Sequence, residues 1–185
     1  ENGQIAALQA ELLHIEQYVE MVLSYLRLDS ESSDLLLRTC DLDSVIRQAV
    51  RKYARLFILK KLSLDFRESG IRVLTDEKWL LFVIEQLLSN ALKYTNEGHI
   101  SIYTEGKVLV VADTGIGICA EDLPRVFEKG FTGYNGREDK KSTGIGLYLC
   151  RRICEKLGHK ISISSEKGHG TSVRIDMTGG EQVIE

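Results

Sequence analysis

The sequence predicts an α+β protein, in which helices cover one face of a mixed, largely antiparallel sheet to form a two-layer sandwich, preceded by a long helix. Three observations predict this class. Segments with apolar residues every three or four positions, typical of helices, are separated by pairs of short apolar runs. Glycine-containing turns join two of these pairs, as in hairpins. The repeated strand–helix–strand units of a parallel sheet are absent from the pattern.

The first 30 residues follow a separate pattern. Their apolar positions alternate at spacings of three and four: Ile5, Leu8, Leu12, Ile15, Val19, Val22 and Leu26. We expect a helix from Gln4 to Leu28, about 37 Å long at 1.5 Å per residue. A single helix cannot bury its own apolar stripe. The regular period therefore favours a bundle or coiled coil over packing on the helix's own domain.

The second predicted unit spans residues 41–180, after a linker over 31–40 and before a tail over 181–185. The polar run Asp29–Asp34 marks the break between the first helix and this linker. Asp41 is the expected N-cap of its first helix. The predicted elements are a helix from Asp41 to Leu59, strands 62–66 and 71–74, a helix after Asp76 reaching Leu92, a hairpin of 99–104 and 107–112, a short helical piece over 121–127, a helix over 144–157, and a hairpin of 160–165 and 171–177.

Composition narrows the class of partner. The 185 residues suit one full domain with an appendage. The formal net charge is -3 and the basic residues are scattered, so nothing favours a nucleic-acid partner. No apolar run approaches the roughly 20 residues that span a bilayer. The sequence begins with Glu and has no signal peptide, so we expect a piece of a longer protein whose remaining part can contain membrane spans.

The four cysteines are Cys40, Cys119, Cys150 and Cys154. Cys150 and Cys154 lie one helical turn apart with His159 beyond them, but a zinc site needs about four ligands. Buried thiols in a reducing compartment are the favoured interpretation.

Two nucleotide-binding patterns fail on context. Gly115–Ala120 satisfies the dinucleotide pattern G-x-G-x-x-G/A, but no helix opens there and no second parallel strand follows. Lys141 and Ser142 end like a phosphate-binding P-loop, but Lys140 occupies the required glycine position.

A wider set of motifs is more specific. LLSNALKYT (87–95), DTGIG (113–117), FEKGFTG (127–133) and STGIGL (142–147) occur in this order. They resemble the N, G1, F and G2 boxes of the ATP-binding domain of sensor histidine kinases, over residues 39–180. This domain belongs to the wider fold shared with type II topoisomerases, mismatch-repair ATPases and a heat-shock chaperone. The run ELLHIEQYVEMVLSYLRL is similar to the second helix of the kinase dimerisation hairpin in the subgroup that senses peptide antibiotics beside transporters.

The resemblance implies that the protein binds ATP and Mg²⁺. Gln86, Asn90 and Lys93 are the implied catalytic residues, and they share one helix face with Tyr94. The Asn90 amide oxygen suits Mg²⁺, a hard cation. The Asp113 carboxylate can accept a hydrogen bond from the adenine amine. The implied nucleotide-binding residues are Asn90, Lys93, Tyr94, Asp113, Gly115, Gly117, Ile118, Phe131, Ser142, Thr143, Gly144, Ile145, Gly146, Leu147 and Thr171.

Residues 118–143 are then the expected lid. Glycines give the segment hinge capacity, and closure over a nucleotide is a common way to exclude water. Phe127 and Phe131 either pack the lid shut or anchor it to the core. Its basic residues either reach phosphates or remain solvated: Lys129, Arg137, Lys140 and Lys141.

The reaction class follows from two further positions. Related ATPases place a water-activating glutamate four residues before the Mg²⁺ asparagine, where this chain has Gln86, an amide that cannot act as a base. Glu85 is rotated about 100° around the helix. The family's acceptor histidine is followed five positions on by proline, and none of the histidines fits: His14, His99, His159 and His169.

We therefore expect Mg-ATP binding without autophosphorylation. The resemblance implies a response regulator, a second kinase subunit joined through the dimerisation helices, and a peptide transporter as partners, with the chain a cytoplasmic part of a cell-membrane protein. The alternatives are an ATPase or ATP-gated clamp of the same fold, and a nucleotide-free interaction module.

Overall fold

The computed structural model describes residues 8, 12, 15, 16, 18–26, 35–133 and 143–179. The chain divides into two compact units, residues 1–34 and 35–185. All described residues of the first unit are helical. The rest of the helix predicted over 4–28 lies outside the described residues, so its length stays a prediction. In the described part of the chain, no helix is both long enough and apolar enough to cross a membrane.

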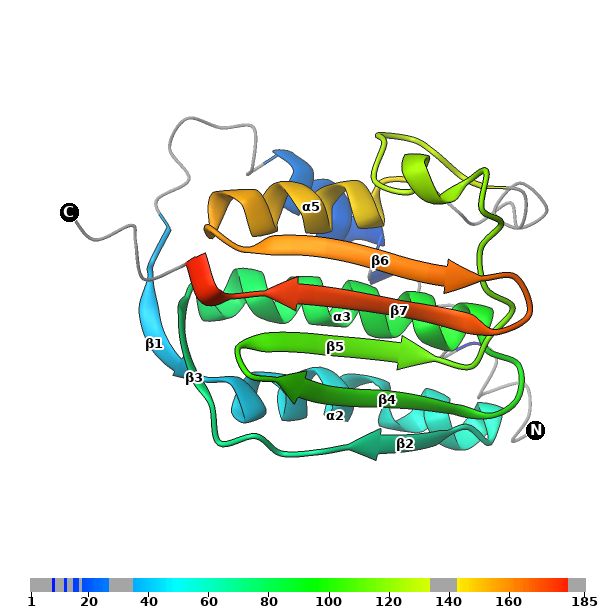
Figure 1. Ribbon diagram of the computed structural model, residues 1–185, viewed down its shortest axis with the longest axis horizontal. Coiled ribbons are helices and arrows are strands. Elements are labelled where there is room, and N and C mark those ends of the chain that lie inside the picture. The colour runs from blue at the N-terminus through cyan, green and yellow to red at the C-terminus, as the bar shows by residue number, and fades with distance from the viewer. Residues whose placement is uncertain are drawn as a thin grey trace. The chain divides into compact units, whose positions relative to one another are not determined.

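The second unit is built on a five-stranded sheet (Figure 1). Its strands lie in the order β2 (Ser63–Phe66), β4 (His99–Glu105), β5 (Val108–Asp113), β7 (Gly170–Asp176) and β6 (Lys160–Glu166). The β2 and β4 strands are parallel, while every other neighbouring pair is antiparallel. The predicted mixed, largely antiparallel sheet is confirmed.

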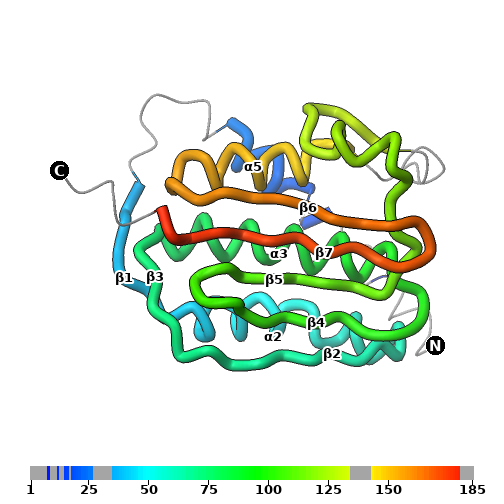
Figure 2. The backbone as a smooth tube through the Cα atoms, in the orientation of Figure 1, coloured from blue at the N-terminus to red at the C-terminus, as the bar shows by residue number. Residues whose placement is uncertain are grey.

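Three helices cover one face of this sheet, as Figure 1 shows: α2 (Leu42–Lys60), α3 (Glu77–Tyr94) and α5 (Gly146–Lys156). The backbone trace in Figure 2 shows α3 between the other two helices, behind the middle of the sheet. Its side chains Leu80, Ile84 and Leu88 are fully buried, as are Ile102 and Leu109 of the sheet. Burial of each such side chain stabilises the fold by about 1.5–3 kcal/mol. The two-layer sandwich is confirmed.

One strand was not predicted. The β1 strand (Arg38–Asp41) pairs antiparallel with β3 (Arg72–Thr75), with Cys40 opposite Val73. Residues up to 40 are expected to be a linker, because the run RTCD lacks alternating apolar residues. Only Cys40 of this strand is buried. The strand exists because β3 supplies its backbone partners, which local sequence does not reveal.

Two predicted helices have different bounds. The α5 helix begins at Gly146 instead of residue 144, because Gly144 has a φ of +66°, which an α-helix cannot accommodate. The helical piece predicted over 121–127 is one 3₁₀ turn, η1 (Leu123–Arg125), which contains Pro124 at its start. Both differences lie beside glycine-rich segments, where periodicity carries little information.

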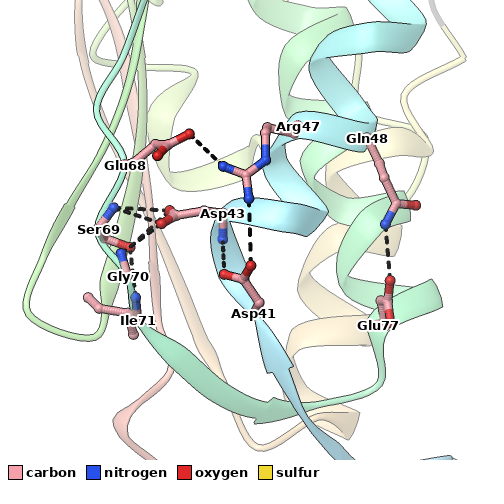
Figure 3. A network of polar contacts seen from close by, with 9 residues as sticks. All are labelled: Asp41, Asp43, Arg47, Gln48, Glu68, Ser69, Gly70, Ile71 and Glu77. Atoms are coloured by element: carbon pink, nitrogen blue, oxygen red, sulfur yellow. Dashed lines mark hydrogen bonds and ion pairs between the residues drawn. The ribbon is translucent and has the colours of Figure 1, made fainter.

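A polar network fastens the loop between β2 and β3 to the start of α2 (Figure 3). The buried Asp43 carboxylate accepts hydrogen bonds from the Ser69 amide, the Ser69 hydroxyl and the Gly70 amide, the last at 2.7 Å. Arg47, one turn later, pairs with Glu68 of the same loop. A buried charge is tolerated only when it is hydrogen-bonded in this way. The network therefore holds the small β1–β3 sheet beside the first helix.

Candidate functional site

The predicted site residues that the structure describes gather at one edge of the second unit. Figure 1 shows the end of β5, the turn between β6 and β7, and the last turn of α3 at the right-hand edge of the sheet. Asp113 is the last residue of β5, and Thr171 lies directly opposite it on β7. The two positions implied for the adenine pocket are thus neighbours across two strands.

Burial dominates the environment of the Asp113 carboxylate. It raises the pKa above the ordinary 3.8, against the lowering effects of the Gly115 and Thr171 amides and of the Thr95 hydroxyl. The Gly115 amide donates to Asp113 Oδ1 at 2.8 Å. Thr95 Oγ1 is fully buried and makes no hydrogen bond of good geometry to a described residue. The Asp113 carboxylate is therefore a half-buried hydrogen-bond acceptor, which suits a donor group on a ligand.

The glycine loop after β5 is held from two sides. On one side, the Ile116 amide donates to the Tyr94 carbonyl at the end of α3, at 3.1 Å. On the other, the Ile116 carbonyl accepts from the Gly168 amide in the β6–β7 turn, at 2.8 Å. Gly117 has a φ of +67°, and a Cβ there would lie 2.0 Å from the Glu166 carbonyl oxygen. Only glycine allows this approach.

The predicted polar face of α3 carries Gln86, Asn90, Lys93 and Tyr94, all half-buried. The Lys93 ammonium lies 5.2 Å from the centre of the Tyr94 ring. A Cβ on Gly146 would lie 3.0 Å from Gln86 Oε1, which places this face of α3 beside the first turn of α5.

The middle of the predicted lid meets the residue that directly follows the lid. The Gly130 amide donates to the Gly144 carbonyl at 2.9 Å, and a Cβ on Gly144 would lie 2.5 Å from the Gly130 carbonyl carbon. The Phe131 ring lies 4.5 Å from the Arg125 guanidinium. Ser142 and the preceding residues 134–141 of the lid lie outside the described residues. The lid boundaries stay a prediction.

The start of α5 can receive an anion. Thr143, Gly144 and Ile145 precede the helix, and Gly146 and Leu147 are its first residues. No described side chain caps this end. Backbone amides at a helix N-terminus that lack internal partners bind phosphate groups favourably.

The residues present fit a phosphate-bound Mg²⁺ ion. In the described ranges, no three His, Cys, Asp or Glu side chains form a cluster that can hold a metal. A nucleotide-bound Mg²⁺ needs few protein ligands, because phosphate oxygens and waters supply most of its shell. The amide oxygen of Asn90, on the same helix as Lys93, is the candidate protein ligand.

Three further residues at this edge were not predicted from the sequence. Ser165 of β6 bonds to the Ile118 amide, and Lys60 of α2 donates to the Leu92 and Thr95 carbonyls at the end of α3. The third is Thr95, described above. A signal existed for Ser165, because it has the same strand parity as Ile161 and Ile163 and therefore shares their face.

The cysteine pair of α5 consists of buried thiols, as expected. Burial raises the pKa of Cys154 to about 12 and that of Cys150 well above its usual range. His159 is buried too, with Nε2 3.1 Å from the Thr75 hydroxyl. Thiols that remain protonated at neutral pH are inert packing groups.

Comparison with known proteins indicates a family of ATP-binding proteins. Residues 75–179 match the family model described as histidine kinase-, DNA gyrase B-, and HSP90-like ATPase. The chain is 38% identical over 166 residues to the sensor protein BceS of Halalkalibacterium halodurans, covering 88% of this chain and 50% of that protein. It is 36% identical over 174 residues to the sensor histidine kinase YxdK of Bacillus subtilis, covering 90% and 54%.

The structural comparison extends over nearly the whole chain. The crystal structure of full-length ShkA in complex with AMPPNP superposes with a TM-score of 0.71 at 23% identity, covering 95% of this chain and 38% of that one. At this identity the likeness concerns the fold alone. The chain spans about half the length of the two sensor proteins that it matches.

Proposed function

The chain belongs to the family of histidine kinase-, DNA gyrase B- and HSP90-like ATPases, and from this we propose that it is the ATP-binding catalytic part of a sensor histidine kinase. The observation that carries the proposal is the cross-strand neighbourhood of Asp113 and Thr171, beside a glycine loop held between α3 and the β6–β7 turn. The names of the matched relatives, which are sensor proteins, support the same reading.

Each group of the site has a task that its chemistry allows. The Asp113 carboxylate accepts a hydrogen bond from the exocyclic amine of adenine, which guanine does not offer at that position. The first amides of α5 bind phosphate oxygens. Lys93 adds positive charge near the phosphates, and the Tyr94 ring borders the sugar or base.

Asn90 holds Mg²⁺ through its amide oxygen when the nucleotide is bound, and the ion neutralises charge on the phosphates. Phosphoryl transfer depends mainly on positioning and on electrostatic stabilisation. We propose that the protein presents the γ-phosphate to a histidine outside this sequence, because none of its four histidines has the family's proline five positions on.

Nucleotide binding tests the proposal directly. Titration calorimetry with a non-hydrolysable ATP analogue is expected to show binding that depends on Mg²⁺. Asn90→Ala and Asp113→Ala are expected to weaken it at least tenfold, whereas the exposed controls Asn96→Ala and Asp65→Ala leave it within twofold. Unchanged binding in both site variants would contradict the proposed site.

Incubation with labelled ATP separates the alternatives. The chain alone is expected to accumulate no acid-labile phosphate and to release little inorganic phosphate, because Gln86 cannot activate water. Steady phosphate release would favour an ATPase or ATP-gated clamp. Failure to bind any adenine nucleotide would favour an interaction module.

The wider setting is also a proposal. The resemblance of the N-terminal helix to the kinase dimerisation hairpin supports a homodimeric full-length protein that signals to a response regulator. Its similarity to the peptide-antibiotic-sensing subgroup supports a transporter as a further partner and a membrane anchor elsewhere in the protein. Phosphoryl transfer to a candidate response regulator, measured with the full-length kinase, tests this setting.

A further inference from the structure

The Ser165 hydroxyl is the meeting point of three segments at the site edge. It lies 2.9 Å from the Ile118 amide in the glycine loop, 2.7 Å from the Gly170 carbonyl and 2.9 Å from the Thr171 hydroxyl. Ser165 is half-buried near the end of β6, on the face opposite to the exposed Ser164. One small side chain thus joins the loop after β5 to the first residues of β7.

Counting hydrogens fixes the direction of each of these bonds. A serine hydroxyl has one hydrogen and two lone pairs. The Gly170 carbonyl can only accept, so it receives the Ser165 hydrogen, and the Ile118 amide can only donate, so it occupies one lone pair. The Thr171 hydroxyl must then donate into the second lone pair. Thr171 Oγ1 is left with lone pairs and no free hydrogen.

From this we infer that Ser165 is a positioning residue that makes Thr171 an acceptor toward the base and thereby sets selectivity for a 6-amino purine. The inference rests on the proposed function and deepens it. Thr171 lies directly opposite Asp113 across the strands, so the two side chains share one face of the sheet and offer neighbouring acceptors. An amine at purine position 6 supplies the matching donor, whereas a 6-oxo group brings a further acceptor against them and leaves polar groups unpaired.

The same hydroxyl fixes the glycine loop. Its bond to the Ile118 amide holds the residue that directly follows Gly117, whose backbone packs against the Glu166 carbonyl. Loss of the Ser165 oxygen therefore removes the loop's side-chain anchor on β6 while its backbone bond from Gly168 to Ile116 remains. Loss of the Ser165 hydroxyl is therefore expected to loosen the glycine loop locally while the strands of the sheet stay paired.

The selectivity experiment compares non-hydrolysable analogues of ATP and of inosine triphosphate, which differ at the 6-amino group. The wild-type chain is expected to prefer the ATP analogue, and Ser165→Ala to narrow this preference at least fivefold. Ser165→Cys nearly keeps the side-chain volume but weakens the hydrogen bonds. It is expected to narrow the preference for the ATP analogue in the same way, which gives a second test if the alanine variant does not fold. Ser165→Thr restores the wild-type preference, and Ser164→Ala retains it.

A double variant of Ser165 and Thr171 distinguishes a positioning role of Ser165 from a general loss of structure. Thr171→Val is expected to narrow the preference for the ATP analogue. Adding Ser165→Ala to Thr171→Val is expected to narrow this preference no further. Hydrogen exchange at the Ile118 amide of the nucleotide-free protein is expected to be at least tenfold faster in Ser165→Ala, with the amides of β5 unchanged.

The outcomes separate this inference from the proposed function. A wild-type chain that binds neither analogue overturns both. A wild-type chain that prefers the ATP analogue, with Ser165→Ala and Ser165→Cys preferring it to the same extent, overturns this inference and leaves the proposed function standing. An additive effect of Ser165→Ala and Thr171→Val also overturns it, because the two hydroxyls then act independently.

Discussion

The Lys52 ammonium of α2 lies 2.7 Å from Glu85 Oε2 of α3, and the two side chains are only 20% and 12% exposed. This ion pair turns Glu85 toward α2. The next residue, Gln86, has its amide oxygen beside Gly146 at the start of α5. The carboxylate nearest in sequence to the water-activating position therefore has a structural role, and an amide occupies the position itself.

Glu85→Gln is expected to destabilise the fold by about 1–3 kcal/mol, because it removes the negative charge from the ion pair with the largely buried Lys52 ammonium. Urea unfolding measures this loss. Replacing both Lys52 and Glu85 by methionine is expected to recover most of the stability, since the double variant removes both charges of this pair together. Nucleotide affinity is expected to stay within threefold of wild type in both variants. A folded Glu85→Gln protein without nucleotide binding would place Glu85 in the site.

Asp113→Asn is expected to stabilise the nucleotide-free protein while weakening its binding of ATP. A carboxyl whose pKa is raised by burial binds its proton more tightly in the folded than in the unfolded chain. Stability therefore falls as the pH rises from 3.8 through the raised pKa, and the penalty is fully present above that value. Removal of the charge should raise the melting temperature of the nucleotide-free protein at pH 7 by about 2–4 °C. It should weaken ATP binding at least tenfold.

Thermal unfolding at pH 7 and pH 4 checks the sign for Asp113. The gain in melting temperature should shrink at pH 4, where the wild-type carboxyl is closer to protonation in both states. A variant that melts lower than wild type at pH 7, by an amount that does not change with pH, would contradict the burial argument.

His159 is expected to make the fold sensitive to acid. Burial lowers its pKa below the ordinary 6.5, with Asp176 acting in the opposite direction. The unfolded chain therefore takes up a proton at a higher pH than the folded chain, and stability is lost as the pH falls below about 6.5 toward the lowered pKa. Between pH 7 and pH 5, His159→Gln should show a smaller loss of unfolding free energy than wild type. The exposed His99→Gln is the control, and an equal slope in both variants would exclude His159.

Gly117→Ala is expected to abolish nucleotide binding and to cost more than about 2 kcal/mol, because the new Cβ would lie 2.0 Å from the Glu166 carbonyl oxygen at a φ of +67°. Gly106→Ala is the matched control. Gly106 has a φ of +59° in the β4–β5 turn with nothing within 4 Å of a Cβ. It should cost about 1 kcal/mol through backbone strain alone and leave binding intact. Equal losses in the two variants would show that the contact with Glu166 is unimportant.

The elements that the sequence predicted well are those with a strong local period. The α3 helix begins after its N-cap Asp76, as expected, and the Asp76 carboxylate accepts from the Lys78 and Trp79 amides. The β4–β5 hairpin was also predicted, because its alternating residues flank a glycine turn. The β1 strand was missed, because it owes its existence to β3, more than thirty residues away. The roles assigned to individual site residues stay predictions.

The amino-acid sequence by itself determined the fold class, the helix faces and the four motifs that identify the family. These are properties of local spacing, which the periods of helices and strands translate directly into structure. Only the tertiary structure decided that Glu85 pairs with Lys52 and that Lys60 donates a hydrogen bond to the Thr95 carbonyl at the end of α3. It also decided that the Ser165 hydroxyl bonds to both the Ile118 amide and the Thr171 hydroxyl. The contacts of Glu85 with Lys52, of Lys60 with α3 and of Ser165 with Ile118 link elements distant along the chain, and their geometry is set by how the helices and the sheet pack.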